Sequence, residues 1–126
     1  MTGLVHAGRT CGDPAALERL RRLGGNALLR DMVALFREQI PPRMAMARAG
    51  VACGDVAAVK VAAHAMRSSC GPLGAVAMRE LCEQVEHAAR ALDLTPVPAL
   101  LDALEEEERR VLAWLERATS ELAGAA

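Results

Sequence analysis

Helical periodicity is the feature that most constrains how this chain can fold. Apolar residues recur three and four positions apart through most of the sequence, and the runs end at clear helix boundaries. Asp13-Pro14 combines a side-chain cap with a proline in the first turn, and Gly24-Gly25 is a stop signal. Further boundaries follow at Cys53-Gly54-Asp55, Gly71-Pro72-Leu73-Gly74 and Thr95-Pro96. We therefore expect five helices that begin at about residues 13, 26, 56, 75 and 95.

Composition agrees with an all-α fold. Hydrophobic residues make up 52% of the 126 residues, chiefly Ala and Leu, whereas aromatic residues make up 2% and tyrosine is absent. Helix formers are abundant and strand formers scarce, and the length suits one domain. We predict an antiparallel up-down four-helix bundle over residues 26–118, with a short N-terminal helix, 13–23, packed across one end. The domain then covers 13–122, between a flexible tail at 1–12 and a short tail at 123–126.

The second helix contains two features that its apolar stripe does not explain. Pro41-Pro42 removes two backbone donors from its middle, so we expect a kink or a local break there. Gln39 and Arg43 also project onto the apolar stripe. If the next helix folds back antiparallel, both residues come level with His64 and can line a groove beside it. The alternative is that the kink rotates both side chains into water.

Charge and cysteine usage exclude several classes of function. A net charge of −1 argues against a nucleic-acid partner, and no apolar run is long enough to span a membrane. The start lacks the apolar middle of a signal peptide, so we expect a cytoplasmic protein, and the initial Met favours a free-standing one. The four cysteines have no metal-type spacing, which predicts free thiols and no metal site.

His64 is the outstanding candidate for chemistry. On the helix that begins at Val56, it points away from the apolar face by roughly 120–140° on a wheel of 100° per residue. Lys60 and Arg67 put a cation one turn before and one turn after it, and the small residues Ser68 and Gly71 share its side. A neutral imidazole is a nucleophile without any general base, and cations stabilise a phosphoryl group. Packing alone does not explain a histidine in this position.

These residues resemble the histidine-containing phosphotransfer (HPt) domains of phosphorelays. The similarity rests on His64, the hydrophobic Met66, Ser69 and the closing Leu73-Gly74-Ala75, and the helical layout extends it from about Asp13 to about Ala118. Two positions depart from the family pattern, with Arg67 in place of Lys and Ser68 in place of Gly; Ser68 narrows the approach to His64 but offers a hydroxyl to a phosphoryl oxygen.

The resemblance implies what the chain does and with what. His64 accepts a phosphoryl group and exchanges it with the aspartate of a response-regulator receiver domain. Lys60, Arg67, Ser68, Gly71, Gln39 and Arg43 stabilise the phosphoryl group or face the partner. It also implies no kinase activity and no cofactor of its own, since the receiver supplies the Mg²⁺. A receiver domain, a hybrid sensor histidine kinase or both are the expected partners of a monomer.

Two alternatives remain. A related helical bundle can bind a receiver or kinase domain without carrying phosphate, and the substitutions at Arg67 and Ser68 keep this interpretation open. An α-helical enzyme or metal site built on His64 and His87 is disfavoured, because the two lie on outward faces of different helices. His87, with Glu83 one turn earlier, is interpreted as a surface residue, as is His6. Glu105–Glu108 is interpreted as a solvated run in which Glu108 lies nearest the apolar stripe.

Overall fold

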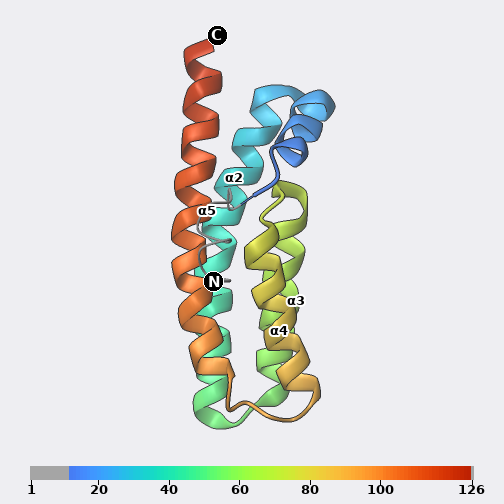
Figure 1. Ribbon diagram of the computed structural model, residues 1–126, viewed down its shortest axis with the longest axis vertical. Helices are drawn as coiled ribbons and strands as arrows, with labels where there is room; N and C mark the ends of the chain where they lie inside the picture. Colours follow the sequence, from blue (N-terminus) through green and yellow to red (C-terminus); the bar gives the residue numbers. More distant parts are fainter. Residues whose placement is uncertain (1–11, 126) are drawn as a thin grey trace, which may run out of the picture.

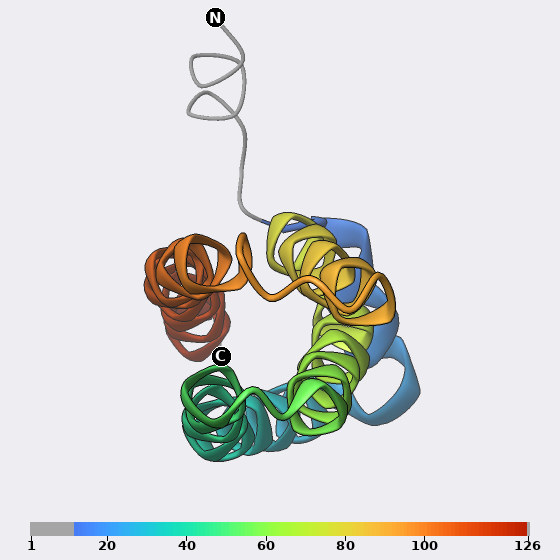
Figure 2. The same cartoon turned by 90° about the horizontal axis from the view of Figure 1, so that it is seen from below.

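The computed structural model describes the backbone of residues 12–125 and the side chains of residues 12–120. Within it the chain forms helices α2 (Pro14–Cys53), α3 (Val56–Leu73), α4 (Val76–Arg90) and α5 (Val97–Ala125), and no β-strand. Successive helices run in opposite directions, and α5 returns beside α2 (Figure 1). Seen along its axis the bundle is a ring of four helices (Figure 2). The predicted all-α, up-down bundle is confirmed.

The expected N-terminal helix is the first part of α2. Within α2 the backbone leaves helical values at Gly24 and Gly25, where φ is 71° at Gly25, so residues 14–23 and 26–53 are two helical segments joined by a kink. Asp13 starts the first segment, because its Oδ1 accepts from the Ala15 N–H at 3.0 Å. Its own N–H donates to the Gly74 carbonyl at 2.8 Å. This bond places the first segment across the α3–α4 turn, as predicted (Figure 1).

Of the kink or local break expected at Pro41-Pro42, the local break does not occur. Gly24 and Gly25 are the positions at which α2 leaves helical geometry, and the helix continues through both prolines. Pro41 and Pro42 lie on the exposed side of the helix, as do Arg37 and Glu38, four residues earlier. The carbonyl groups that lose their amide partners there face water, which can replace the missing hydrogen bonds.

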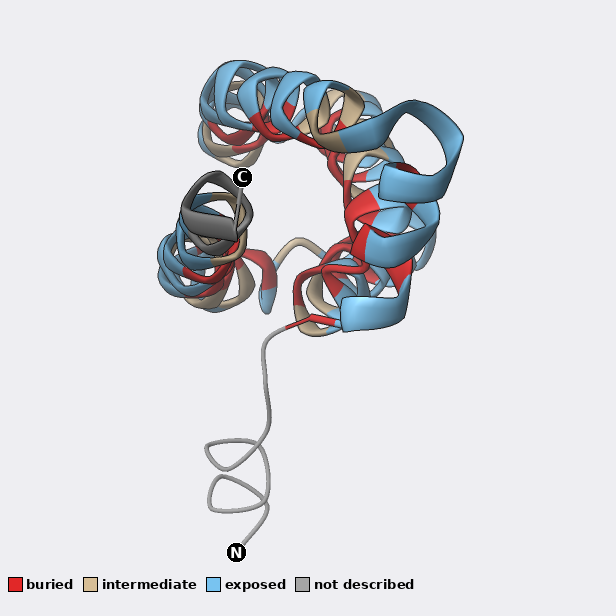
Figure 3. Cartoon of the chain, turned by 90° about the horizontal axis from the view of Figure 1, so that it is seen from above, coloured by how far each residue is buried: buried red, intermediate tan, exposed pale blue. Residues whose placement is uncertain are grey.

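The core lies along the inner faces of all four helices (Figure 3). Its largest fully buried apolar side chains are Leu29, Phe36, Ile40, Val59, Met66, Leu73, Met78, Val85, Leu101, Leu104 and Leu115. Cys70 of α3 and Cys82 of α4 are buried among them as free thiols. A hydrogen bond with the Cys70 thiol, together with burial, raises the pKa of Cys82. Both residues therefore act as small apolar core residues, as the sequence indicated.

Two leucines that continue the apolar helical spacing of their segments are exposed. Leu23 retains 79% and Leu92 77% of their accessible surface. Leu23 is the last residue before the Gly24-Gly25 kink, and Leu92 adopts a left-handed φ of 57° beyond the end of α4. The N–H groups of Leu92 and Asp93 donate to the carbonyls of Ala89 and Ala88, at 3.0 Å each, which closes α4 earlier than expected.

The helix after this turn begins later than the Thr95-Pro96 signal suggests, at Val97. Thr95 instead belongs to the turn, where its N–H donates to Asp93 Oδ1 at 3.0 Å. Hydrogen bonds from the side chain and the backbone of Thr95 lower the pKa of Asp93. The connection is thus closed by a side-chain acceptor rather than by a capping threonine.

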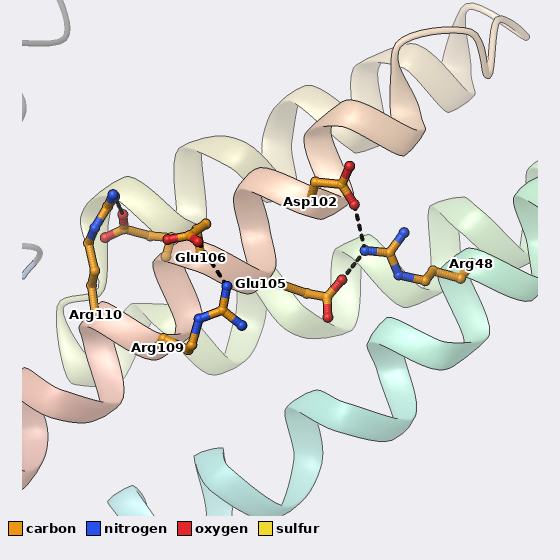
Figure 4. Close-up of polar contacts among 7 residues, drawn as sticks. Arg48, Asp102, Glu105, Glu106, Arg109 and Arg110 are labelled. Atoms are coloured by element: carbon orange, nitrogen blue, oxygen red, sulfur yellow. Dashed lines mark hydrogen bonds and ion pairs between the residues drawn. The ribbon is translucent and has the colours of Figure 1, made fainter.

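Ion pairs join α5 to α2 on the outside of the bundle (Figure 4). Arg48 contacts both Asp102, at 3.0 Å, and Glu105, and further along Arg37 lies 2.8 Å from Glu116. Glu105 is therefore held in an interhelical pair rather than being freely solvated. Such exposed pairs contribute little stability one by one, but they fix which edge of α5 faces α2.

Glu107, interpreted from the sequence as one of the solvated members of the run, lies in the apolar stripe of α5, whereas Glu108 lies at the margin of the stripe. Glu107 is buried and Glu108 only partly so. Glu107 lies three residues after Leu104 and four before Val111, which both face the core. Its Oε1 accepts from Arg110 at 3.0 Å, so the carboxylate keeps one partner at the rim. Partial burial raises the pKa of Glu108.

Three glycines provide a matched test of this packing. Gly54 and Gly74 both have left-handed φ values, of 70° and 68°, whereas Gly71 is helical. A Cβ on Gly74 would lie 2.7 Å from the Ala16 Cβ and 2.8 Å from the Asp13 carbonyl oxygen, whereas a Cβ on Gly54 or Gly71 meets nothing within 4 Å.

We therefore expect three different outcomes for alanine substitution, measured by urea unfolding. Gly54→Ala should cost about 1 kcal/mol of unfolding free energy from backbone strain alone. Gly74→Ala should cost roughly 1–3 kcal/mol more, because it also overpacks the contact with residues 13–16. Gly71→Ala should gain about 0.5–1 kcal/mol from helix propensity. Equal costs at Gly54 and Gly74 would contradict the docking of the first helical segment on the α3–α4 turn.

Candidate functional site

His64 lies midway along α3, on the side away from the core. Val59, Ala62, Ala63 and Met66 are fully buried, whereas the His64 side chain keeps 60% of its accessible surface. The charged residues of α3 are Lys60, His64 and Arg67, and the helix contains no acidic residue. The exposed position and the all-cationic helix are as the sequence indicated.

The acidic partner of this helix comes from α4, and the sequence analysis missed it. Glu86 retains only 2% of its accessible surface. Its Oε1 lies 3.2 Å from His64 Nδ1 and 3.7 Å from Arg90, and its Oε2 lies 3.1 Å from Arg67 Nε. The last contact is an ion pair without hydrogen-bond alignment, so Oε2 has no hydrogen bond within the described part of the chain. One buried carboxylate is thus surrounded by an imidazole and two guanidinium groups.

The contacts of Nδ1 define the tautomer of His64. Nδ1 lies 3.2 Å from Glu86 Oε1 and 3.1 Å from Arg67 Nη2. A guanidinium has only donors, so Arg67 could bond Nδ1 only if that nitrogen had no proton. The buried carboxylate needs a donor far more than the half-exposed guanidinium needs an acceptor, because an unpaired buried charge is very costly. We therefore assign the proton to Nδ1, which donates to Glu86 and leaves the Nε2 lone pair free.

The other predicted site residues on α3 lie around this imidazole. Lys60 is exposed one turn before His64, and Arg67 contacts both His64 and Glu86. The Ser68 hydroxyl donates to the His64 carbonyl at 3.1 Å, so it is engaged by its own helix rather than directed at an incoming group. Gly71 is exposed with open space around it.

On α2, Gln39 and Arg43 are both exposed rather than part of the apolar stripe. Gln39 Oε1 accepts from the Ser69 hydroxyl at 3.3 Å, so it contacts the helix that carries His64. Because α2 and α3 are antiparallel, Arg43 follows one turn closer to the level of His64. It faces water, and its place in the site stays a prediction.

The remaining candidates do not join the site. His87 is exposed on α4 beside Glu83, whereas His6 and Cys11 lie outside the described residues. Within residues 12–120, no three His, Cys, Asp or Glu side chains are grouped as metal ligands would be. Over the described chain, none of the four helices has both the length and the apolar content that crossing a bilayer requires.

The described chain is thus an up-down helical bundle that presents an exposed imidazole held by a buried carboxylate and flanked by cations. Residues 31–114, more than half of the chain, match the family model of the Hpt domain. The chain belongs to the Hpt domain family.

A solved structure shows the same fold. The crystal structure of histidine-containing phosphotransfer protein B (HptB) from Pseudomonas aeruginosa PAO1 superposes with a TM-score of 0.82. The match covers 88% of this chain and 96% of that one, at 22% sequence identity. Among curated proteins, the sequence search found no match.

The tautomer assignment predicts the nitrogen NMR spectrum of His64. At pH 8 we expect Nδ1 to carry the proton and Nε2 to appear as the unprotonated nitrogen, because the Glu86 carboxylate can only accept. The exposed His87, which no buried carboxylate constrains, serves as the internal control and should show the mixture of tautomers found in a free imidazole. A protonated Nε2 on neutral His64 would contradict the assignment.

Proposed function

We propose that this protein is a histidine phosphotransfer protein that relays a phosphoryl group between His64 and the aspartate of a response-regulator receiver domain. Membership of the Hpt domain family supports phosphotransfer in a phosphorelay. The observation that carries the assignment to His64 is its geometry: an exposed imidazole whose Nδ1 is anchored to Glu86, so that Nε2 faces outward as a free nucleophile.

The transfer step follows from this arrangement. The Nε2 lone pair attacks the phosphorus of an aspartyl phosphate, the P–O bond breaks, and its electron pair returns to the aspartate carboxylate. No general base is needed, because Nε2 is already unprotonated. The exposed guanidinium groups of Arg67 and Arg90 are close enough to stabilise charge on the phosphoryl oxygens, and Lys60 adds a third cation nearby. Mg²⁺ would come from the receiver domain.

Hpt domains are phosphocarriers that act with receivers and kinases of two-component systems, so a partner must bring its own catalytic machinery to His64. We accordingly propose that the chain has no kinase activity and no cofactor of its own. A receiver, a hybrid sensor kinase or both are its proposed partners. The monomeric state, the lack of a nucleic-acid partner and the cytoplasmic location stay predictions from the sequence.

Substitution of the imidazole tests the assignment. His64→Gln should abolish labelling from a phosphorylated receiver, because a glutamine amide is not a nucleophile, whereas His87→Gln should be labelled like the wild type. Phosphate content is measured by intact-protein mass spectrometry, and the label should be acid-labile and base-stable. Thermal melts establish that both variants fold. Undiminished labelling of folded His64→Gln would end the proposal. Receiver binding by a wild-type protein that takes up no label would instead support the interaction module.

The departure at Ser68 yields a second test. The residue four on from His64 lies about 5–6 Å from it between Cβ atoms, so its size limits how closely a receiver can approach. Ser68→Gly should cost about 0.5–1 kcal/mol of stability. It should nevertheless speed transfer, because the Ser68 hydroxyl donates to its own helix and its removal takes no hydrogen bond from the phosphoryl group. Ser68→Leu should slow transfer by about 10²-fold without unfolding the exposed helix surface.

Single-turnover transfer from a phosphorylated receiver provides the rates, and thermal melts provide the stabilities. Ala34→Leu, at an exposed position of α2 on the opposite side of that helix from Arg43, is the control. Transfer by Ser68→Leu at the wild-type rate would show that the partner does not dock over this face.

A further inference from the structure

We propose that Glu86 is a positioning residue that sets how readily phosphorylated His64 gives up its phosphoryl group, by holding a proton on Nδ1 of the phospho-imidazole. The proposal rests on the proposed function, because it concerns the phosphorylated form of His64. Glu86 does not touch the phosphoryl group. It acts through the opposite nitrogen of the ring, from a buried position on a different helix.

The charge balance around Glu86 changes when His64 is phosphorylated. In the structure the carboxylate shares the His64 Nδ1–H, Arg67 and Arg90. Both guanidinium groups reach solvent, with 32% and 55% of their side-chain surface exposed, and can turn toward the new negative charge on Nε2. Glu86 cannot follow them, since it is 2% exposed. Its remaining close donor is then Nδ1–H, so the buried carboxylate favours the protonated ring.

A proton on Nδ1 makes the phospho-imidazole a better donor. When the P–N bond breaks, its electron pair goes to Nε2 and the phosphoryl group passes to an aspartate oxygen or to water. With Nδ1 protonated, the leaving group is a neutral imidazole that already carries its Nδ1–H. Without that proton, the leaving group would be an imidazolate anion, which is much less stable near neutral pH. The protonated ring is therefore the reactive form.

The other charged and titratable groups near the ring act in known directions. On α3, Lys60 and Arg67 oppose protonation of Nδ1, and on α4, Arg90 does the same. On α2, Arg43 lies near this level and also opposes it. Cys82 of α4 lies near Glu86 but stays a neutral thiol, because a hydrogen bond with Cys70 and burial raise its pKa. From α5, Asp102 and Glu105 pair with Arg48. Glu83 lies one turn before Glu86 on α4, but it is exposed, so water screens its charge. The buried Glu86 and the phosphoryl group thus supply most of the negative charge at the ring.

The test compares the pH dependence of phosphohistidine hydrolysis in wild type, Glu86→Gln and Glu83→Gln. The Glu86→Gln side chain keeps the size and can still accept from Nδ1, but it lacks the charge, whereas Glu83 is an exposed residue of the same helix. We expect the midpoint of the Glu86→Gln profile to move to lower pH. For each pH unit of that shift, hydrolysis above both midpoints should slow about tenfold. Glu83→Gln should have the wild-type midpoint. Glu86→Asp keeps the negative charge, so its midpoint should lie between those of Glu86→Gln and the wild type.

The outcomes separate this proposal from the proposed function. If no protein in the series is labelled on His64, phosphotransfer itself fails. If all are labelled and the profiles of wild type and Glu86→Gln coincide, or if Glu86→Gln hydrolyses faster, the role of Glu86 is overturned while phosphotransfer stands. Should Glu86→Gln not fold, nitrogen NMR titration of phosphorylated wild-type protein decides. Nδ1 should then stay protonated to higher pH than in a phosphohistidine within an unfolded peptide of residues 56–73, and an equal or lower midpoint overturns the proposal.

Discussion

A buried carboxylate must be compensated by donors or by opposite charge, since leaving it unpaired costs several kcal/mol. Glu86 lies on the face where α4 packs against α3. Its partners there are His64, Arg67 and Arg90, the same groups that the proposed phosphoryl transfer uses. The imidazole gains a fixed orientation, and Arg67 is drawn beside it. The exposed site is therefore positioned by the side chain of Glu86, which is buried and not accessible to a partner.

This arrangement also explains why arginine is well suited to position 67. Arg67 places its Nε 3.1 Å from Glu86 while its Nη2 lies beside the His64 ring, a reach that a planar, branched cation provides. A lysine has one ammonium group, so it could contact the carboxylate or an incoming phosphoryl group but not both at once. The departure from the family's Lys thus fits the acidic Glu86 beneath the histidine.

Most of the fold could be predicted from the sequence because the helices are amphipathic and end at local signals. The errors arose where packing overrides a local signal: α2 runs through Pro41-Pro42 because the freed carbonyls face water. For the site, His64 and its flanking cations could be found from helical spacing alone, but Glu86 could not. A signal existed, since Glu86 lies four residues after the buried Cys82 and one after the buried Val85. The sequence does not show that His64 and Arg67 of α3 contact Glu86 and so compensate its buried charge.

Within the described chain, α5 is the helix that makes no contact with the helix that carries His64. The helix that carries His64 contacts α2 and α4, while α5 lies across the ring and packs against those same two helices. Its outward surface is held in register by Arg48 and Arg37 of α2, far from the imidazole. Substitutions on the exposed side of α5 therefore leave the groups around His64 in place. This makes α5 the helix on which to attach a fluorophore, provided that Glu105 and Glu116, which pair with Arg48 and Arg37, are kept.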